Sequence, residues 1–528
     1  MAADARPVLD SGAPTLAVAA GAAWVGPAPH NAKRWTTAPG TGAHRCSLIT
    51  PSRGAVPTTA VPNLLGPLGA AAIAAATTAL AVGSNAGAVA PKRCGGLALQ
   101  RRKGQRWRSH RGRGRAVAVG ATSDTAAAAG GAAQQSDRSY LNVTGFPFPL
   151  GPLFARRTVR RSVGDGMWTF EQEQSLANIA VNVRMTAIRL ACGGLWIHNP
   201  VAPTEECVAL LRELGLPVRY IVLGTTQYEH KIFVGPFSRR WPEAKVYQVP
   251  QQWSWPLDLP SALFGIFTAG ELGASSDAPW HDEIEQKLLG PSTRLGSRVG
   301  INYSAAECAF FHKSSKTLIC TDALVFVPRE PPSVLDEAEL IALGRDQNIV
   351  LDVVALTNWR GSGDVVRAAQ QSEADAASGG PPSQRSPREL LTRGWQRDAL
   401  LALFFGPDGR SILEPAEAFA AISGRWIVGP VCYSLVYSGD IRQEVLAWAR
   451  SFCEWDFQQI LPSHFDGPVA GTPDDVRRAF EVLEDGVEAT KSPEFALPWP
   501  FPQQVRYREQ DLQLLTDIRR VLRGIGVL

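Results

Sequence analysis

The sequence predicts an α/β domain that follows a disordered N-terminal segment. Between residues 184 and 250, apolar stretches rich in Val, Ile and Leu alternate with stretches of helical character, which indicates a layered α/β fold. The charge distribution is uneven: residues 1–135 contain 15 Lys and Arg against three acidic residues, whereas the rest of the chain carries 38 basic and 46 acidic residues. The overall charge of +4 therefore averages two unlike segments and does not indicate a nucleic-acid-binding protein.

Residues 1–138 are expected to be disordered. They are rich in Ala, Gly, Pro, Ser and Thr, so they cannot bury enough apolar surface to offset the entropy lost on ordering. An Arg-rich, hydroxyl-containing and acid-poor N-terminus is typical of an organelle transit peptide, and the abundance of Ala resembles chloroplast-targeted proteins of green algae. We therefore predict a chloroplast protein whose leader is removed on import.

Two stretches of this leader have alternative interpretations. Residues 64–90 are long enough to span a membrane, but Ala adds little hydrophobicity and polar residues interrupt the run, so an integral membrane protein is not expected. The basic run 101–115 could bind RNA through its phosphates. A solvated charge run is the simpler interpretation inside a transit-like region.

The eight cysteines indicate no zinc knuckle, because none of them form a C-x-x-C pair. Six lie beyond the leader, mostly in apolar stretches of predicted strand or helix. We expect these six to be buried free thiols, which fits a reducing compartment.

Folded structure is predicted from residue 139 onward, and its first elements alternate between strand and helix. They are two strands within 184–200, a helix at 204–215, a strand at 218–224, a helical stretch through 240 and a strand at 244–250. Thr204 is the expected N-cap of the first helix and Gly215 its stop. The continuous apolar run of 218–224 is typical of a strand that is buried on both faces.

The second half of the chain predicts further elements of both kinds. They are a hairpin at 308–327, a helix at 442–457, a strand that begins at 458 and leads into a loop, and a helix at 472–485. The last helix should begin with a capping box, with Thr472 as cap, Pro473 at the first helical position and Asp475 closing the box. The predicted domain covers 139–490, and a C-terminal helical extension covers 491–528.

Residues 361–393 are expected to form an inserted surface loop. Their composition is small and polar and includes Pro and Gly. The sequence thus assigns them no place in the core.

Four stretches of the chain carry a resemblance to a known family: MWTFEQEQSLANIAVNVRMTAIRLACGGLWIHNPVAPTEECVALL, YIVLGTTQYEHKIFVGPFSRRWPEAKVYQVPQQWSWPLDLP, FFHKSSKTLICTDAL and WDFQQILPSHFDGPVAGTPDDVRRAFEVL. In these stretches the chain resembles the plant, algal and cyanobacterial family called domain of unknown function 4336. That family is similar to the metallo-β-lactamase fold, so the resemblance implies an αββα sandwich. The family has no assigned activity, and the resemblance implies no reaction.

The resemblance also implies a set of candidate metal ligands. In the metallo-β-lactamase superfamily, the motif H-x-H-x-D-H follows a strand, and later positions supply a histidine, a bridging aspartate and a last histidine. In this chain, three of the positions that hold the first ion carry other residues: Thr225, Gln227 and Tyr303. The positions that hold the second ion keep two carboxylates and two imidazoles: Glu229, His230, Asp322 and His464.

The resemblance thus implies a lost first site and a complete second site. Nitrogen and oxygen donors suit zinc, iron or manganese. Glu229 stands where the motif has Asp and extends the carboxylate by roughly 1.5 Å, so the ion or the backbone would have to shift. A metal-free hydrogen-bonded cluster of the same residues is the open alternative, and the expected cofactor is one zinc, iron or manganese ion or none.

Other polar residues are expected to have structural roles. His198 and His312 are interpreted as scaffold histidines with satisfied ring nitrogens, and Asp466 as a loop-capping carboxylate. Trp253 and Trp255 would either line a pocket beside the site or be buried under a loop.

Two classes of function remain. We expect a non-catalytic scaffold or small-molecule binder that keeps a degenerate metallo-β-lactamase-like domain. The alternative is a mononuclear metal-dependent hydrolase that uses the second site, with Glu229 or Asp322 directing the proton. No catalytic residue is assigned, the partner is unknown, and a fold by itself gives no function.

Overall fold

The computed structural model describes most of the chain beyond residue 136. The described residues are 137–141, 151–152, 154–176, 179–252, 260–290, 294–295, 303–357, 361–379, 385–437, 439–484 and 507–524. The predicted leader lies outside them except for its last two residues. Among the described helices, none has both the length and the apolar character that crossing a membrane requires.

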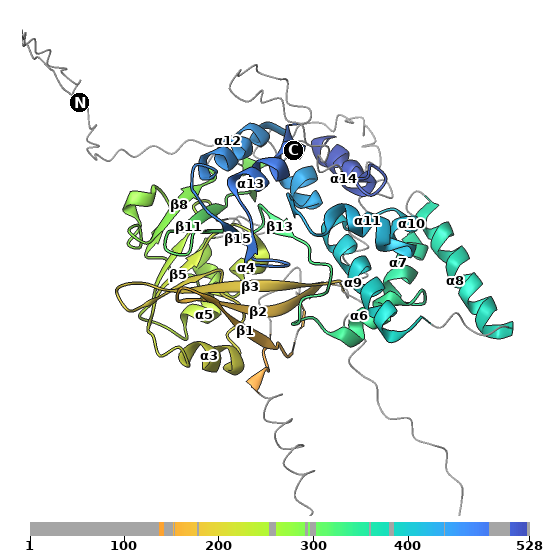
Figure 1. The fold of residues 1–528 in the computed structure, drawn as a ribbon, viewed down its shortest axis with the longest axis horizontal. Helices are drawn as coiled ribbons and strands as arrows, with labels where there is room; N and C mark the ends of the chain where they lie inside the picture. The colour runs from red at the N-terminus through yellow and green to blue at the C-terminus, as the bar shows by residue number, and fades with distance from the viewer. Residues whose placement is uncertain are drawn as a thin grey trace, which may run out of the picture. The chain divides into compact units, whose positions relative to one another are not determined.

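A seven-stranded sheet forms the first half of the domain (Figure 1). Its strands are adjacent in sequence order: β1 (Thr158–Gly164), β2 (Met167–Leu176), β3 (Ile179–Arg189), β4 (Leu195–His198), β5 (Val218–Leu223), β6 (Lys245–Gln248) and β7 (Gly270–Glu271). Strands β1 to β4 pair antiparallel, and β4 to β7 pair parallel. The change of direction follows from the connections, because a helical segment joins β4 to β5 whereas short turns join the earlier strands.

A five-stranded sheet forms the second half, with the order β16-β15-β12-β11-β8. Its strands are β8 (Ile284–Leu288), β11 (Cys308–His312), β12 (Thr317–Ile319), β15 (Gln459–Leu461) and β16 (Val469–Ala470). The pair β12 and β15 is parallel and the other pairs are antiparallel. Two small sheets pair β9 (Arg294–Leu295) with β10 (Tyr303–Ser304), and β13 (Val325–Phe326) with β14 (Trp426–Ile427).

The two sheets pack face to face around an apolar core. Trp196 and Val222 from the first sheet and Phe310, Ile319 and Leu461 from the second belong to one buried cluster. Successive side chains of a strand point to opposite faces of the sheet. The residues that alternate with this cluster along each strand therefore point away from the shared core, and their apolar side chains must be covered by other elements.

Helices cover both outer faces. The helices α3 (Glu205–Arg212) and α5 (Val234–Ser238) pack on the first sheet, where Leu211 and Phe237 share a cluster with Ile221. The helices α12 (Arg442–Phe452) and α13 (Pro473–Phe480) pack on the second sheet, where Phe452 and Phe480 share a cluster with Phe311 and others. The predicted αββα sandwich is therefore confirmed.

The local predictions around the helix ends are also confirmed. Thr204 caps α3 by accepting a hydrogen bond from the backbone N–H of Cys207, and Gly215 has the positive φ of +67° expected after a helix. Thr472 and Asp475 form the capping box of α13, with Pro473 at its start. The six cysteines beyond the leader are free, as predicted, and four of them are buried. The prediction of burial is wrong for Cys192, which is exposed, and Cys432 is half-buried.

A group of helices lies beside the sandwich (Figure 1). It contains α6 (Glu337–Gly344), α7 (Ile349–Thr357), α8 (Ser362–Gly379), α9 (Pro387–Phe404), α10 (Gly409–Leu413) and α11 (Pro415–Ile422). Helices α6 and α9 approach backbone to backbone, since a Cβ on Gly394 would lie 1.8 Å from the carbonyl oxygen of Leu340. Only glycine fits such a crossing.

The prediction of a loop at 361–393 is wrong. Helix α8 occupies most of the segment and α9 begins within it, after a capping box between Ser386 and Glu389. The Ala, Gln, Glu and Arg of this stretch are good helix formers despite their small or polar character, and packing against neighbouring helices selects the helix over a loop. Val366 of α8 is fully buried in a cluster with α7, α9 and α10.

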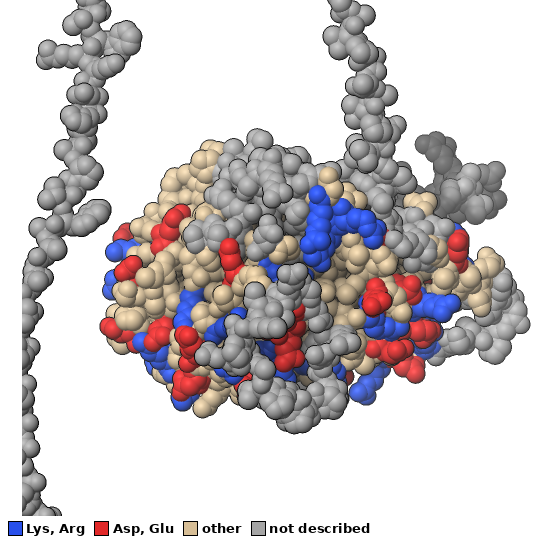
Figure 2. All heavy atoms as spheres, turned by 90° about the horizontal axis from the view of Figure 1, so that it is seen from above, with Lys and Arg blue, Asp and Glu red and all other residues tan. Residues whose placement is uncertain are grey.

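The remaining helical segments of the described residues are short or lie near the C-terminus. They are α4 (Tyr228–Lys231), the 3-10 helices η1 (Ser261–Phe264), η2 (Ser275–Asp277), η6 (Gly439–Ile441) and η7 (Glu481–Leu483), the π-helix η5 (Cys432–Val436) and α14 (Gln513–Gly524). Helix α14 lies within the predicted C-terminal extension and buries Leu515. On the face that Figure 2 shows, basic and acidic side chains are mixed over the described residues.

Candidate metal centre

The four predicted ligands lie after the carboxyl ends of three strands. Glu229 and His230 are in α4, which follows β5, whereas Asp322 follows β12 and His464 follows β15. Strands β12 and β15 are parallel neighbours, so their carboxyl ends share one edge of the second sheet. The backbone N–H of Cys308 donates to the carbonyl of Gly224, and this bond ties the loop after β5 to the same region.

The structure brings all four side chains together. One ligand atom from each of them lies within 4.8 Å of the others. The Nε2 atoms of His230 and His464 are 3.2 Å apart, and Oδ1 of Asp322 lies 3.2 Å from the His464 Nε2 and 3.6 Å from the His230 Nε2. Three donor atoms thus form a small triangle, with Glu229 beside it.

The site is mostly shielded from water. The side chain of His230 is fully buried, and those of Asp322 and His464 are 14% and 11% exposed. Burial acts to raise the pKa of the Asp322 carboxyl, but the imidazoles of His230 and His464 outweigh it and hold that pKa well below its usual value. Asp322 is therefore an anion in the folded protein.

The hydrogen bonds around the histidines define part of their orientation. Nδ1 of His464 lies 2.9 Å from the carbonyl oxygen of Asn182, and a carbonyl can only accept, so Nδ1 carries the hydrogen. The Nε2 of a neutral His464 then has a lone pair that points at His230 and Asp322. Among the described residues, Nδ1 of His230 and Oδ2 of Asp322 are buried without a hydrogen-bond partner.

Sequence reasoning missed Glu307, a buried carboxylate directly behind Asp322. It is 2% exposed and accepts hydrogen bonds from the backbone N–H groups of Thr321, Asp322 and Ala323. Burial and the Asp322 carboxylate raise the pKa of Glu307 to about 8, although the three N–H groups oppose them. The sequence does contain a signal for Glu307, because an acidic residue directly precedes the apolar strand CAFFH. Such a position is expected to be buried, and no basic residue stands next to it as a partner.

Thr225 and Tyr303, where the resemblance implies lost ligands, have other contacts. Oγ1 of Thr225 accepts a hydrogen bond from the backbone N–H of Gln227, and its carbonyl accepts one from Gln252. The backbone of Tyr303 pairs with Leu295 in the small sheet, and its side chain lies outside the described residues. Thr225 thus has a local structural role in the loop.

The other histidines differ in their outcome. The ring of His312 is hydrogen bonded to Ser315 at 2.7 Å, as expected of a scaffold histidine. The expectation is wrong for His198, since both of its ring nitrogens are buried without a partner among the described residues. Burial lowers the pKa of His198 to about 3, so its ring is neutral and packs against Trp196 and Phe310.

Asp466 and the two tryptophans complete the set of sequence predictions. Oδ1 of Asp466 accepts a hydrogen bond from the backbone N–H of Gly467, which agrees with a loop-capping role. Trp253 and Trp255 lie outside the described residues, so their predicted place stays a prediction.

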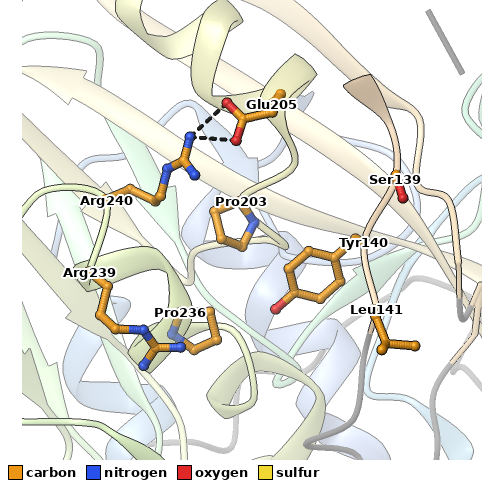
Figure 3. A pocket seen from close by; sticks show the side chains of 8 residues that line it. All are labelled: Ser139, Tyr140, Leu141, Pro203, Glu205, Pro236, Arg239 and Arg240. Atoms are coloured by element: carbon orange, nitrogen blue, oxygen red, sulfur yellow. Dashed lines mark hydrogen bonds and ion pairs between the residues drawn. The ribbon is translucent and has the colours of Figure 1, made fainter. Parts of the chain in front are cut away.

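A surface hollow of about 420 Å³ lies elsewhere on the domain (Figure 3). Its lining residues are Ser139, Tyr140, Leu141, Pro203, Glu205, Pro236, Arg239 and Arg240. Arg240 donates to both carboxylate oxygens of Glu205 at 2.7 Å. None of the four candidate ligands lines this hollow.

Comparison with protein families gives one match. A family model described as "Domain of unknown function (DUF4336)" matches residues 164–420 and 412–482. Among curated proteins, none matches the chain.

Solved structures to which the chain is similar include metallo-β-lactamases and flavodiiron proteins. A metallo-β-lactamase from Pontibacter korlensis is 12% identical over 35% of this chain and 83% of its own, with a TM-score of 0.26. The Flv1 flavodiiron core from Synechocystis is 11% identical over 62% of this chain and 82% of its own, with a TM-score of 0.26. The rubredoxin oxygen:oxidoreductase from Desulfovibrio gigas is 10% identical over 69% of this chain and 99% of its own, with a TM-score of 0.23.

Proposed function

The chain belongs to the family described as domain of unknown function (DUF4336), and from this premise we propose that its domain binds a single transition-metal ion. The ligands are the four side chains that the structure brings together: Glu229, His230, Asp322 and His464. Two imidazoles and two carboxylates suit zinc, iron or manganese. An ion held in this way is a Lewis acid, and it also joins the loops that follow β5, β12 and β15.

The spacing of three donor atoms carries this proposal. Zinc binds imidazole nitrogen and carboxylate oxygen at about 2.0–2.2 Å, so neighbouring donors of a tetrahedral site lie roughly 3.3–3.6 Å apart. The separations between His230, His464 and Asp322 are 3.2, 3.2 and 3.6 Å. Three side chains from distant parts of the sequence therefore already have the mutual spacing of ligands to one ion.

Buried atoms without partners further support a metal. Oδ2 of Asp322 is such an atom within the described part of the chain, and leaving a buried polar atom unpaired costs about 1–3 kcal/mol. Nδ1 of His464 carries a hydrogen toward the carbonyl oxygen of Asn182. Burial lowers the pKa of His464, but the Asp322 carboxylate outweighs it and raises that pKa, so the metal-free contact between the His464 Nε2 and Asp322 calls for an added proton on Nε2. A metal ion in this position would replace that proton.

We propose a non-catalytic scaffold or small-molecule binder as the role of the metal-bound domain. The low exposure of His230, Asp322 and His464 supports this role, because a hydrolase must admit its substrate to the ion. The replacement of first-site ligands at Thr225, Gln227 and Tyr303 supports it as well. A mononuclear hydrolase is the competing function, and its activity would have to disappear in Asp322→Ala.

Metal analysis of the full chain tests the proposal. The protein is purified without a chelator and without a polyhistidine tag, incubated with zinc, iron(II) or manganese(II), and passed through a desalting column. We expect about one ion per chain for at least one of the metals, and a near-complete loss in His464→Ala and Asp322→Ala. A wild-type chain that retains no ion refutes the proposed function.

We also propose that the protein acts in the chloroplast. The basic, Ala-rich composition of residues 1–138 supports this location. Cell fractionation with an antibody against the domain tests it, and exclusively cytosolic protein refutes it.

A further inference from the structure

We propose that Glu307 is the positioning residue of the metal centre, because it holds the backbone that carries Asp322. This inference rests on the proposed function, and it assigns a role to a residue that does not itself contact the ion. Its basis is a set of hydrogen bonds that joins the two halves of the site through one amino acid.

The side chain of Glu307 binds three consecutive backbone N–H groups. Oε1 accepts from Thr321 at 2.7 Å and from Ala323 at 3.3 Å, and Oε2 accepts from Asp322 at 3.2 Å. The hydroxyl of Tyr437 donates to Oε2 over 3.5 Å. Three successive N–H groups that converge on one carboxylate leave the loop after β12 little freedom to turn the Asp322 side chain away.

The backbone of Glu307 is bound to the other half of the site. Glu307 forms an isolated bridge with Thr225, and the next residue, Cys308, donates to Gly224. Thr225 opens the loop that leads to Glu229 and His230 in α4. Glu307 therefore connects the loop that carries these two ligands with the loop that carries Asp322.

Stability alone does not account for a carboxylate at this position. Glu307 is 2% exposed and lies near the Asp322 carboxylate, so burying it is unfavourable compared with an apolar residue of similar size. The two oxygens of Glu307 together accept from three successive N–H groups, however, which an apolar side chain cannot do. Residues behind a metal ligand commonly fix its orientation, and changing them typically costs 10–100-fold in metal affinity.

The first arm of the test measures the loop without any metal. Glu307→Gln keeps the shape of the side chain but replaces one acceptor oxygen with an NH₂ donor. Because both oxygens accept from backbone N–H groups, at least one of these hydrogen bonds is replaced by a repulsive contact between two donors. In the chelator-treated full chain, we expect hydrogen exchange at the amides of 321–323 to speed up at least tenfold. Unchanged exchange at these three amides overturns the inference, whatever the metal content.

The second arm measures zinc affinity by competition with a chromophoric chelator. We expect Glu307→Gln to weaken zinc binding about 10–100-fold and to change the visible spectrum of the cobalt(II) form. Asp511→Asn is the matched control, because Asp511 is also a buried carboxylate that accepts a backbone N–H, from Asp408 at 3.0 Å, in the C-terminal part of the chain. Its zinc affinity should stay within twofold of the wild type.

The outcomes separate this inference from the proposed function. If the wild type binds zinc and Glu307→Gln binds it equally well, the inference fails and the proposed function stands. If the wild type binds no metal, the proposed function fails, and the role of Glu307 as a positioning residue of a metal centre fails with it. Should Glu307→Gln not fold, Glu307→Asp withdraws the carboxylate by roughly 1.5 Å, and it should give at least threefold changes in both arms.

Discussion

Replacement of His230 by alanine should remove the part of the stability that depends on zinc. His230 is fully buried in the first turn after β5, and its Nε2 is one corner of the donor triangle. An ion that binds the folded chain but not the unfolded chain stabilises the fold by mass action. The zinc-dependent increment in unfolding free energy therefore reports the site itself.

The expected magnitude has two separate terms. At a free zinc concentration of 100 times the Kd, the wild type gains about 2.7 kcal/mol, and a 100-fold weaker variant gains only about 0.4 kcal/mol at the same concentration. The loss of a buried ring that packs 5.0 Å from the ring of His464 costs about 1–3 kcal/mol more. This second term is the same with and without zinc.

Chemical denaturation of the full chain separates these terms. Each variant is unfolded once with excess chelator and once with buffered zinc, and the difference between the two unfolding free energies is compared. We expect His230→Ala to lower the difference by about 2 kcal/mol. Gln227→Ala, at a position of the first superfamily site, should leave the difference unchanged.

The result that refutes this reasoning is an equal zinc-dependent increment in both variants. It would mean that zinc binds elsewhere on the chain or that His230 is not a ligand. A destabilised His230→Ala whose increment remains intact would identify His230 as a packing residue alone.

Three further predictions concern other parts of the chain. Burial and, to a lesser degree, the nearby Glu339 carboxylate raise the pKa of Glu173 to about 7. The folded state therefore favours the protonated acid, and the free energy of unfolding should fall by roughly 3 kcal/mol as the pH rises from about 4.5 to 7. Glu173→Gln should flatten this part of the pH profile, and an unchanged profile in denaturation experiments would contradict the assignment. Val366→Ala should destabilise the fold by about 1.6 kcal/mol because the Val366 side chain is fully buried. Val365 is 36% exposed, so Val365→Ala should change stability by less than about 0.5 kcal/mol. Equal losses in the two variants would show that α8 does not pack as described. Mass spectrometry of the mature protein from plastids should find an N-terminus well beyond Met1, and an intact Met1 there would contradict import with cleavage.

The positions of the four candidate ligands could be predicted because each lies just after a strand that the sequence reveals. The apolar runs of β5, β12 and β15 mark strand ends locally, and the resemblance to a known fold supplies the meeting of those ends. The structure confirms that Glu229, His230, Asp322 and His464 come together. Their role as ligands remains the prediction that metal analysis tests.

The error at 361–393 has a different cause. Small and polar residues are compatible with both a loop and an exposed helix, and composition alone does not distinguish them. Helix α8 is stabilised by burying Val366 against α7, α9 and α10, which are its partners in space. A sequence pattern contains no direct information about such partners.

The sequence by itself determined the features that depend on neighbouring residues. The cap at Thr204 and the capping box at Thr472 arise from interactions within a few positions of the chain. Their free energies are set locally, so the pattern of residue types suffices to predict them. The apolar run VRYIVL correctly predicts a strand, but burial on both faces holds only for its second half, since Arg219 is exposed.

Only the tertiary structure decided which groups meet across the two sheets. The contact between Glu307 and the amides of 321–323 spans a hairpin, and the contact between His230 and His464 spans 234 residues. Within the described part of the chain, both ring nitrogens of His198 lack hydrogen-bond partners. This becomes visible only in the tertiary structure, where Trp196 and Phe310 pack against the ring. Such contacts form because the two sheets bury a shared apolar core, and burial of that core sets the distances between polar groups at its edge.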